Sequence, residues 1–320
     1  TIVAGRPGED GVSHPSVAVV LGYYNGEEFL EDQIRSIARQ NHSALEIFVA
    51  DDASSRRVPL EALRPAADCG IPVHVARQPA NVGFSRNFLS ALAAVPRRFE
   101  CFAFSDQDDI WHRDKIARAV THLRAEPEAR PALYCARTAI TDETGSRVHD
   151  FSPFFRKPPS FSNAMVQSIA GGNTMVFNRA AKRLIVKATA ECDVVSHDWW
   201  CYQIITGAGG RVIYDSRPCL DYRQHASNLV GSNQDWRSRL TRSIGLVNGR
   251  YRQWNTINLA ALQRNADLLT ASNRVRLQAF SEARVAPLYK RMRCFRRSGV
   301  YRQKPLQNLA LWATIVCNRV

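Results

Sequence analysis

The sequence predicts an α/β fold, with a mostly parallel central sheet flanked by helices and a basic α-helical C-terminal extension. Through the first 130 residues, short β-branched or aromatic runs alternate with segments of helical periodicity, which is the pattern of a parallel sheet with helices on both faces. The formal net charge of +14 is unevenly placed. Residues 1–230 contain 26 basic and 26 acidic side chains, whereas residues 231–320 contain 17 basic and 3 acidic ones.

The first half of the chain predicts four strands, at 17–21, 45–50, 71–76 and 100–104. Helices are expected after the first and the third strand, because apolar residues recur there at intervals of three and four. Beyond residue 130 the pattern loosens. It predicts strands at 132–137, 174–177, 211–215 and 220–223, helices at 179–190 and 198–206, a loop at 150–163 and basic helices beyond 231.

Composition shifts divide the chain into a flexible lead-in at 1–15, a globular domain at 16–230 and a basic helical tail at 231–320. Apolar residues make up 45% of the chain, enough for a sizeable core. No segment has the roughly 18–20 unbroken apolar residues of a membrane span, and no secretory signal is visible. The eight cysteines have no metal-ligand spacing. We therefore expect reduced thiols and a cytoplasmic location.

Polar residues follow each of the four predicted strands. The clusters are Tyr24-Asn25, Asp51-Asp52, Asn81 to Gly83 and Asp106 to Asp109. In an open parallel sheet the ligand crevice lies outside the carboxyl ends of the strands. The four clusters are therefore predicted to meet at one edge.

The chemistry of this edge favours a cation that holds a diphosphate. The G-x-G-x-x-G and P-loop motifs are absent. Asp106 and Asp108, two apart on a turn, present oxygens to Mg²⁺ or Mn²⁺. Arg86 and Asn87, at a helix start, offer contacts to phosphate or ribose. An isolated Asp-x-Asp is more often a solvated turn or an N-cap, and it is the polar clusters at the other strand ends that favour a site.

Several strings resemble family 2 glycosyltransferases of the Rossmann-like GT-A fold, in a subgroup similar to bacterial rhamnosyltransferases of surface polysaccharide synthesis. The most specific string is Ser-Asp-Gln-Asp-Asp-Ile-Trp at 105–111. The others lie at 23–30, 51–54, 81–87, 171–179, 197–200 and 222–228. The resemblance covers roughly 16–230.

The resemblance implies a role for each matching residue. Asp106 and Asp108 would hold the metal, with His225 approaching it, and Asp198 would be the catalytic base. The nucleotide-sugar site would be lined by Tyr24, Asn25, Asp52, Asn81, Gly83, Arg86, Asn87 and Asp106. The acceptor and sugar pocket would contain Gly172, Asn173, Trp199 and Trp200, with one tryptophan at most facing the site.

The implied reaction is an inverting transfer that depends on a divalent metal. A carboxylate removes the proton of an acceptor hydroxyl as that hydroxyl attacks the anomeric carbon, while the cation stabilises the leaving diphosphate. The subgroup favours dTDP-L-rhamnose as donor, with a UDP-sugar as the alternative, and a glycan or polyprenyl-linked acceptor. The Gln-x-x-Arg-Trp motif of processive synthases is absent, so one sugar per encounter is expected.

The basic tail suits an anionic membrane surface, and we expect peripheral binding at the inner face of the cytoplasmic membrane with no nucleic-acid partner. A solvated helical face is the simpler alternative. Two other functions stay open: a metal-dependent phosphohydrolase that uses the same carboxylates, and a non-enzymatic polybasic module that binds membrane or nucleic acid.

Overall fold

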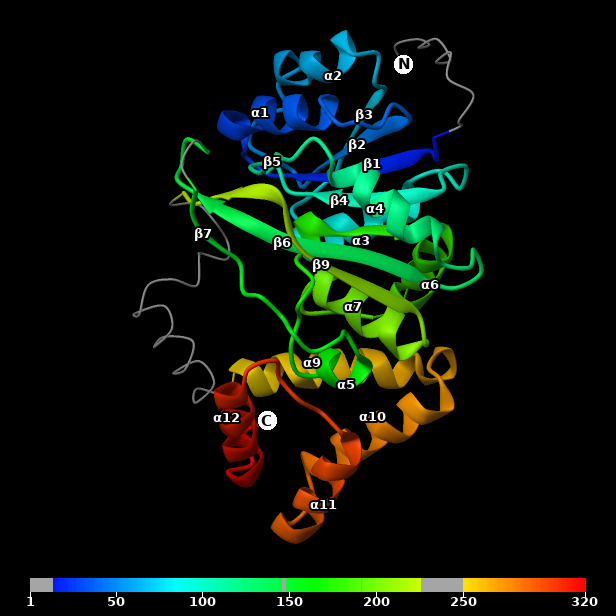
Figure 1. Cartoon of the computed structure of the whole chain (residues 1–320), viewed down its shortest axis with the longest axis vertical. Helices are drawn as coiled ribbons and strands as arrows, with labels where there is room; N and C mark the ends of the chain where they lie inside the picture. The colour runs from blue at the N-terminus through cyan, green and yellow to red at the C-terminus, as the bar shows by residue number, and fades with distance from the viewer. Residues whose placement is uncertain (1–13, 146–147, 191, 226–249) are drawn as a thin grey trace.

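The computed structural model describes residues 14–145, 148–190, 192–225 and 250–320. A central sheet lies between α1 and α2 at one end of the molecule and helices α9–α12 at the other (Figure 1). Most of the expected lead-in and the first part of the expected tail, residues 226–249, lie outside the described residues.

The first half of the chain forms the predicted alternation of strands and helices. Its elements are β1 (Val17–Tyr23), α1 (Glu27–Ala38), β2 (Leu45–Asp51), the 3-10 turn η1 (Glu61–Leu63), α2 (Arg64–Asp68), β3 (Val73–Arg77), α3 (Phe84–Ala94) and β4 (Cys101–Ser105). Strands β3, β2, β1 and β4 are neighbours in that order and all run parallel. The four predicted strands are thus confirmed, and α2 is an addition that the sequence did not indicate.

The second half of the sheet mixes directions. Its elements are β5 (Ile110–Trp111), α4 (Lys115–Arg124), β6 (Ala132–Thr141), β7 (Val148–Phe151), α5 (Phe161–Ala164), η2 (Gly172–Thr174), β8 (Val176–Asn178), α6 (Arg179–Thr189), α7 (His197–Gly207) and β9 (Arg211–Arg223). Strand β8 pairs antiparallel with β4 and β6, whereas β6 and β9 pair in parallel. The two late strands expected at 211–215 and 220–223 form one strand, because irregularities in its pairing with β6 carry it past Pro218.

Alternation along the strands gives each face of the sheet its own core. Val17, Val19 and Leu21 of β1 pack with α1, α2 and α4, whereas Ala18 and Val20 pack with α3, α5, α6 and α7. This two-sided burial explains why β1 and β4 are almost continuously apolar. The carboxyl ends of the strands are left free for polar residues.

Residues 250–320 form helices, in the region where the sequence predicts basic helices. They are α9 (Arg250–Arg264), the 3-10 turn η3 (Ala266–Leu268), α10 (Ala271–Ala283), α11 (Leu288–Ser298) and α12 (Pro305–Val316). Leu262, Phe280 and Phe295 are buried in the same core as Trp200 and Tyr202 of α7. The C-terminal helices therefore pack onto the sheet's own helical layer. Among the described helices, none combines the length and apolarity that a membrane crossing requires.

Candidate active site

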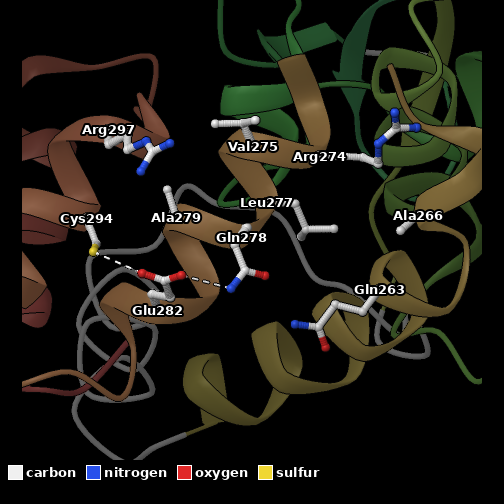
Figure 2. A pocket seen from close by; sticks show the side chains of 10 residues that line it. All are labelled: Gln263, Ala266, Arg274, Val275, Leu277, Gln278, Ala279, Glu282, Cys294 and Arg297. Carbon is white, nitrogen blue, oxygen red and sulfur yellow. Dashed lines mark hydrogen bonds between the residues drawn. The ribbon is translucent and has the colours of Figure 1, made fainter. Parts of the chain in front are cut away.

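Two pockets are relevant to the location of the site. One, of about 540 Å³, lies between α9, α10 and α11. Figure 2 shows that its carboxylate, Glu282, is hydrogen-bonded to Gln278 and Cys294. The other, of about 830 Å³, lies at the carboxyl ends of β2 and β3 and is lined by Asp51 and Arg77. Only the second touches the edge at which the acidic strand ends gather.

The strand ends do meet at one edge. Tyr23 is in register with Asp51 across β1 and β2, and Leu21 is in register with Ser105 across β1 and β4. Beyond the strands, the side chain of Gln107 joins two loops: its Oε1 accepts from the backbone N–H of Tyr24 at 2.8 Å, and its Nε2 donates to the carbonyl of Tyr24 at 3.2 Å. The loop after β1 and the acidic turn after β4 therefore lie side by side.

Three carboxylates form a compact cluster on that turn. Ligand oxygens of Asp106, Asp108 and Asp109 all lie within 4.8 Å of one another. The buried Asp109 accepts a hydrogen bond from Asn173 Nδ2 at 2.8 Å through Oδ2, while its Oδ1 is buried with no hydrogen-bond partner in the described structure. His225, which follows β9, places Nε2 2.9 Å from Asp108 Oδ2.

Negative charge is in excess in this cluster. Burial, together with the carboxylates of Asp108 and Asp198, raises the pKa of Asp106 to about 7. Burial and the carboxylates of Asp108 and Asp106 hold the pKa of Asp109 well above its usual value. Lys115 is the buried cation of the site, and burial lowers its own pKa to about 8.

The residues present fit a hard divalent cation. Such ions take carboxylate oxygens as ligands, and here three carboxylates converge where proximity and burial penalise their negative charges. The unpartnered Asp109 Oδ1 is a buried acceptor that would otherwise cost free energy. Asp106 and Asp108, two of the three metal ligands that the resemblance implied, lie in the cluster, and Asp109 is a further member. His225, the third, contacts Asp108.

Asp198 stands at the start of α7, close enough to Asp106 to raise its pKa. The neighbouring His197 is buried and stacks on Phe88 with ring centroids 4.2 Å apart, and among the described residues neither of its ring nitrogens has a hydrogen-bond partner. Gly172 lies directly against both: a Cβ atom there would be 2.5 Å from His197 Nε2 and 3.4 Å from the Cβ of Asp198. The 171–173 turn is thus fitted to the start of α7.

Asn173 connects that turn to the acidic cluster. Its side chain donates to Asp109, and its carbonyl accepts from Lys115 Nζ at 2.5 Å. Lys115 also lies 3.4 Å from the centroid of the Trp111 ring. The turn near Asp198 and the acidic turn after β4 are therefore held by one buried network, and Asn173 is its central member.

On the donor side, Asp52 organises the loop after β3. Its carboxylate oxygens accept from the backbone N–H groups of Val82 and Gly83 at 2.8 and 2.9 Å, and its carbonyl accepts from Asn81 Nδ2 at 3.2 Å. Gly83 has φ of +83°, a conformation that suits glycine. Asp52, Asn81 and Gly83 are thus brought together as expected from the strand ends.

The other residues expected to line the nucleotide-sugar site differ in their position and burial. Asn25 adopts φ of +46° and accepts from the backbone N–H and hydroxyl of Ser55 at 2.8 and 2.9 Å, so it lies beside the Asp52 loop. Arg86 is exposed and pairs with Asp193 at 3.3 Å. Asn87 is buried and donates to a β2 carbonyl at 2.7 Å, which makes it a support of the loop.

Trp199 and Trp200 both lie in the core, whereas the sequence allowed one of them to face a sugar. Trp199 is 7% exposed and donates its indole N–H to the carbonyl of Ala164 at 2.6 Å. Trp200 is fully buried and donates to Thr189 Oγ1 at 3.0 Å. Buried indoles need such acceptors, and the two tryptophans fix α7 from behind.

Sequence reasoning missed the parts played by Gln107, Asp109 and Lys115. Gln107 and Asp109 belong to the 105–111 string on which the resemblance rests. Their position at the edge of the sheet could therefore be predicted, but the contacts that they make there could not. Lys115 gave no signal, because a lysine at the start of a helix is usually solvated. Its burial arises from the packing of α4 against the sheet.

A comparison of the sequence with known families decides the class. Residues 18–186, more than half of the chain, match the profile of Glycosyl transferase family 2. The chain belongs to this family. The matched region contains the three clustered aspartates, Asn173 and the donor-side loops, and it stops short of Asp198 and the C-terminal helices.

Two relatives of this glycosyltransferase are named as sugar transferases. It is 27% identical over 246 residues to the dTDP-rhamnosyl transferase RfbG of Shigella flexneri, covering 72% of this chain and 80% of RfbG. It is 29% identical over 226 residues to the putative teichuronic acid biosynthesis glycosyltransferase TuaG of Bacillus subtilis, covering 70% and 84% of the two chains.

The fold of the family 2 enzyme is shared with a solved mannosyltransferase. PcManGT from Pyrobaculum calidifontis, determined with GDP-Man and Mn²⁺, superposes with a TM-score of 0.54 at 20% identity, covering 97% of this chain and 82% of that one. The sheet with its flanking helices is therefore the GT-A fold that the resemblance implied. Membership of a transferase family also sets aside the phosphohydrolase and the non-enzymatic module.

Proposed function

We propose that this glycosyltransferase moves L-rhamnose from dTDP-L-rhamnose to a glycan or polyprenyl-linked acceptor, with inversion and with the help of Mg²⁺ or Mn²⁺. The observation that carries the proposal is the cluster of Asp106, Asp108 and Asp109 at the carboxyl edge of the sheet, joined through Asn173 to the turn beside Asp198. A donor and an acceptor then have separate places on one rim.

In this proposal the three aspartates would hold the cation, which, when bound, supplies Lewis-acid stabilisation of the departing diphosphate. His225 holds Asp108 in position from the end of β9. Asp198 accepts the proton of the acceptor hydroxyl as that oxygen attacks the anomeric carbon. One of its oxygens, Oδ1, already accepts from the backbone N–H of Trp199 at 2.7 Å, which fixes the orientation of the carboxylate.

The nucleoside is proposed to lie between the loops that Asn25 and Asp52 organise, over the hollow of about 830 Å³. Val58, Leu60 and Val75 give this hollow an apolar wall, and Arg57 and Arg77 give it positive charge. A pyrimidine nucleotide suits such a surface. The likeness to a dTDP-rhamnosyl transferase supports dTDP over UDP.

The acceptor side is proposed at the 171–173 turn and the start of α7, and one sugar is added per encounter. An acceptor carried on a lipid would bring the enzyme to the inner face of the cytoplasmic membrane as a peripheral protein. The likeness to TuaG, named for teichuronic acid biosynthesis, supports a surface-polymer acceptor.

A panel of nucleotide-sugars tests the donor. Thermal unfolding is recorded with dTDP-L-rhamnose, dTDP-glucose, UDP-glucose and GDP-mannose, each with Mn²⁺ or with EDTA. We expect the largest stabilisation with dTDP-L-rhamnose and Mn²⁺, and slow release of dTDP in the same mixture. Stabilisation by GDP-mannose alone would contradict the base assignment. Equal stabilisation in EDTA would contradict the metal.

A further inference from the structure

Helix α12 is apolar on both of its sides although it lies at the surface. One side, with Leu311 and Ile315, is buried against the C-terminal core, where the Trp312 ring meets Phe295 edge-on at 4.5 Å between centroids. The opposite side is exposed and contains only apolar residues: Pro305, Leu306, Leu309, Ala310, Ala313 and Val316. Leu306 and Leu309 are 77% and 67% exposed. The polar residues of the helix, Gln307, Asn308 and Thr314, are half-buried, so the face turned to solvent presents no polar side chain.

The exposed apolar surface continues beyond α12. Arg291 donates to the carbonyls of Ile315 and Val316 at 3.2 and 3.0 Å, which places the start of α11 at the end of α12. Val285 and Tyr289, in and beside the turn that opens α11, are 82% and 84% exposed. Exposed apolar groups that gather in this way mark an interaction surface.

The segment that forms this surface is strongly basic. Residues 284–320 contain nine lysines and arginines and no aspartate or glutamate. Six of these cations are exposed, namely Lys290, Arg293, Arg296, Arg297, Lys304 and Arg319. Figure 1 shows α11 and α12 at the end of the molecule opposite α1 and α2.

We infer that the outer face of α12, with the α10–α11 turn and the exposed cations of residues 284–320, docks on an anionic lipid surface. Lipid supplies hydrocarbon for Leu306 and Leu309 and negative headgroups for the cations. A second copy of the chain would bring a surface of the same charge, and like charges oppose association. A nucleic acid would meet the cations and leave the leucines in water.

The geometry fits a helix that lies in the interface. The 12 residues of α12 span about 18 Å, well short of a hydrocarbon core of about 30 Å. The inference deepens the membrane placement proposed above by naming the surface. Its test reads lipid binding, so it is decided separately from the donor and the reaction.

The test measures co-sedimentation of the full chain with vesicles of phosphatidylcholine alone or with 30% phosphatidylglycerol. We expect binding to the anionic vesicles and little to the neutral ones. Leu306→Gln with Leu309→Gln should weaken binding at least tenfold. Lys290→Gln with Arg293→Gln should weaken it about 25-fold, at about fivefold per cation removed. Val148→Gln with Phe154→Gln, two half-exposed apolar residues elsewhere, is the matched control and should bind as wild type.

A probe on Cys317 locates the contact. Cys317 is exposed beside the end of α12, and Cys69 is the other exposed cysteine. In a Cys69→Ser background, an environment-sensitive dye on Cys317 should shift to the blue when anionic vesicles are added. Unchanged binding of the Leu306 and Leu309 variant would overturn the inference. A wild-type dimer that this variant converts to a monomer, without vesicle binding, would overturn it in favour of self-association.

Discussion

At the scale of single residues, the acidic turn brings like charges together in a buried position, which disfavours their ionised forms. Three carboxylates stand within reach of one ion, and one of them has a buried oxygen without a described partner. Lys115 compensates only in part, because its ammonium group is engaged by Asn173 and the Trp111 ring. A fold optimised for stability alone would not keep this arrangement, which is why we assign it to ligand binding.

The raised pKa of Asp106 predicts how the effect of Mn²⁺ changes with pH. Between the usual value near 4 and about 7, the folded protein holds a proton that the unfolded chain has released. The metal-free protein should therefore lose stability as pH rises through this window. Because Mn²⁺ competes with that proton, its stabilising effect should grow from pH 5.5 to pH 8.

Thermal unfolding with and without Mn²⁺, at half-unit steps of pH, checks this expectation. Asp106→Asn is the control. It removes this titrating group and should reduce the pH dependence of both curves, whereas Asp109, whose pKa is also raised, still titrates. A Mn²⁺-induced shift of the same size at pH 5.5 and pH 8 would be evidence against ligation by this carboxylate.

At the scale of elements, the 171–173 turn sets the relation between the acidic cluster and α7. Gly172→Ala would place a methyl group 2.5 Å from His197 Nε2 and 3.4 Å from the Cβ of Asp198. We expect kcat to fall at least tenfold while the KM for the donor changes little, because the aspartate turn is untouched. Steady-state kinetics separates the two. Gly171→Ala, whose nearest contact would be Asn173 Oδ1 at 3.1 Å, should lose less, and a larger loss there would contradict this account.

The elements that can be predicted well from the sequence are those indicated by a short run of neighbouring residues. Strands β1, β2 and β4 follow from continuous apolar runs, and the meeting of their polar ends follows from parallel order. The burial of Lys115 and Asn87 could not be predicted, because it depends on which helix covers which part of the sheet. The irregular pairing that joins the two halves of β9 likewise needs its partner strand.

At the scale of the whole molecule, the C-terminal helices and the sheet share a core. Phe280 of α10 is fully buried in the same cluster as Trp200 and Tyr202 of α7. Phe280→Ala should cost about 3–5 kcal/mol, and calorimetry should show one transition at a lower temperature. Val285→Ala, at an 82% exposed position, is the control and should leave it in place. Two separate transitions, with only one of them shifted, would show that the helices unfold independently.

The central claim is that the acidic edge holds a divalent ion that in turn binds the donor's diphosphate. Titration of Mn²⁺ followed by electron paramagnetic resonance, with and without dTDP, tests it most directly. We predict one Mn²⁺ per chain in the presence of dTDP, weakened at least tenfold by Asp108→Asn and unchanged by Asp114→Asn, a half-exposed aspartate that pairs with Arg118 outside the cluster. Equal Mn²⁺ binding by wild type and Asp108→Asn would contradict the account.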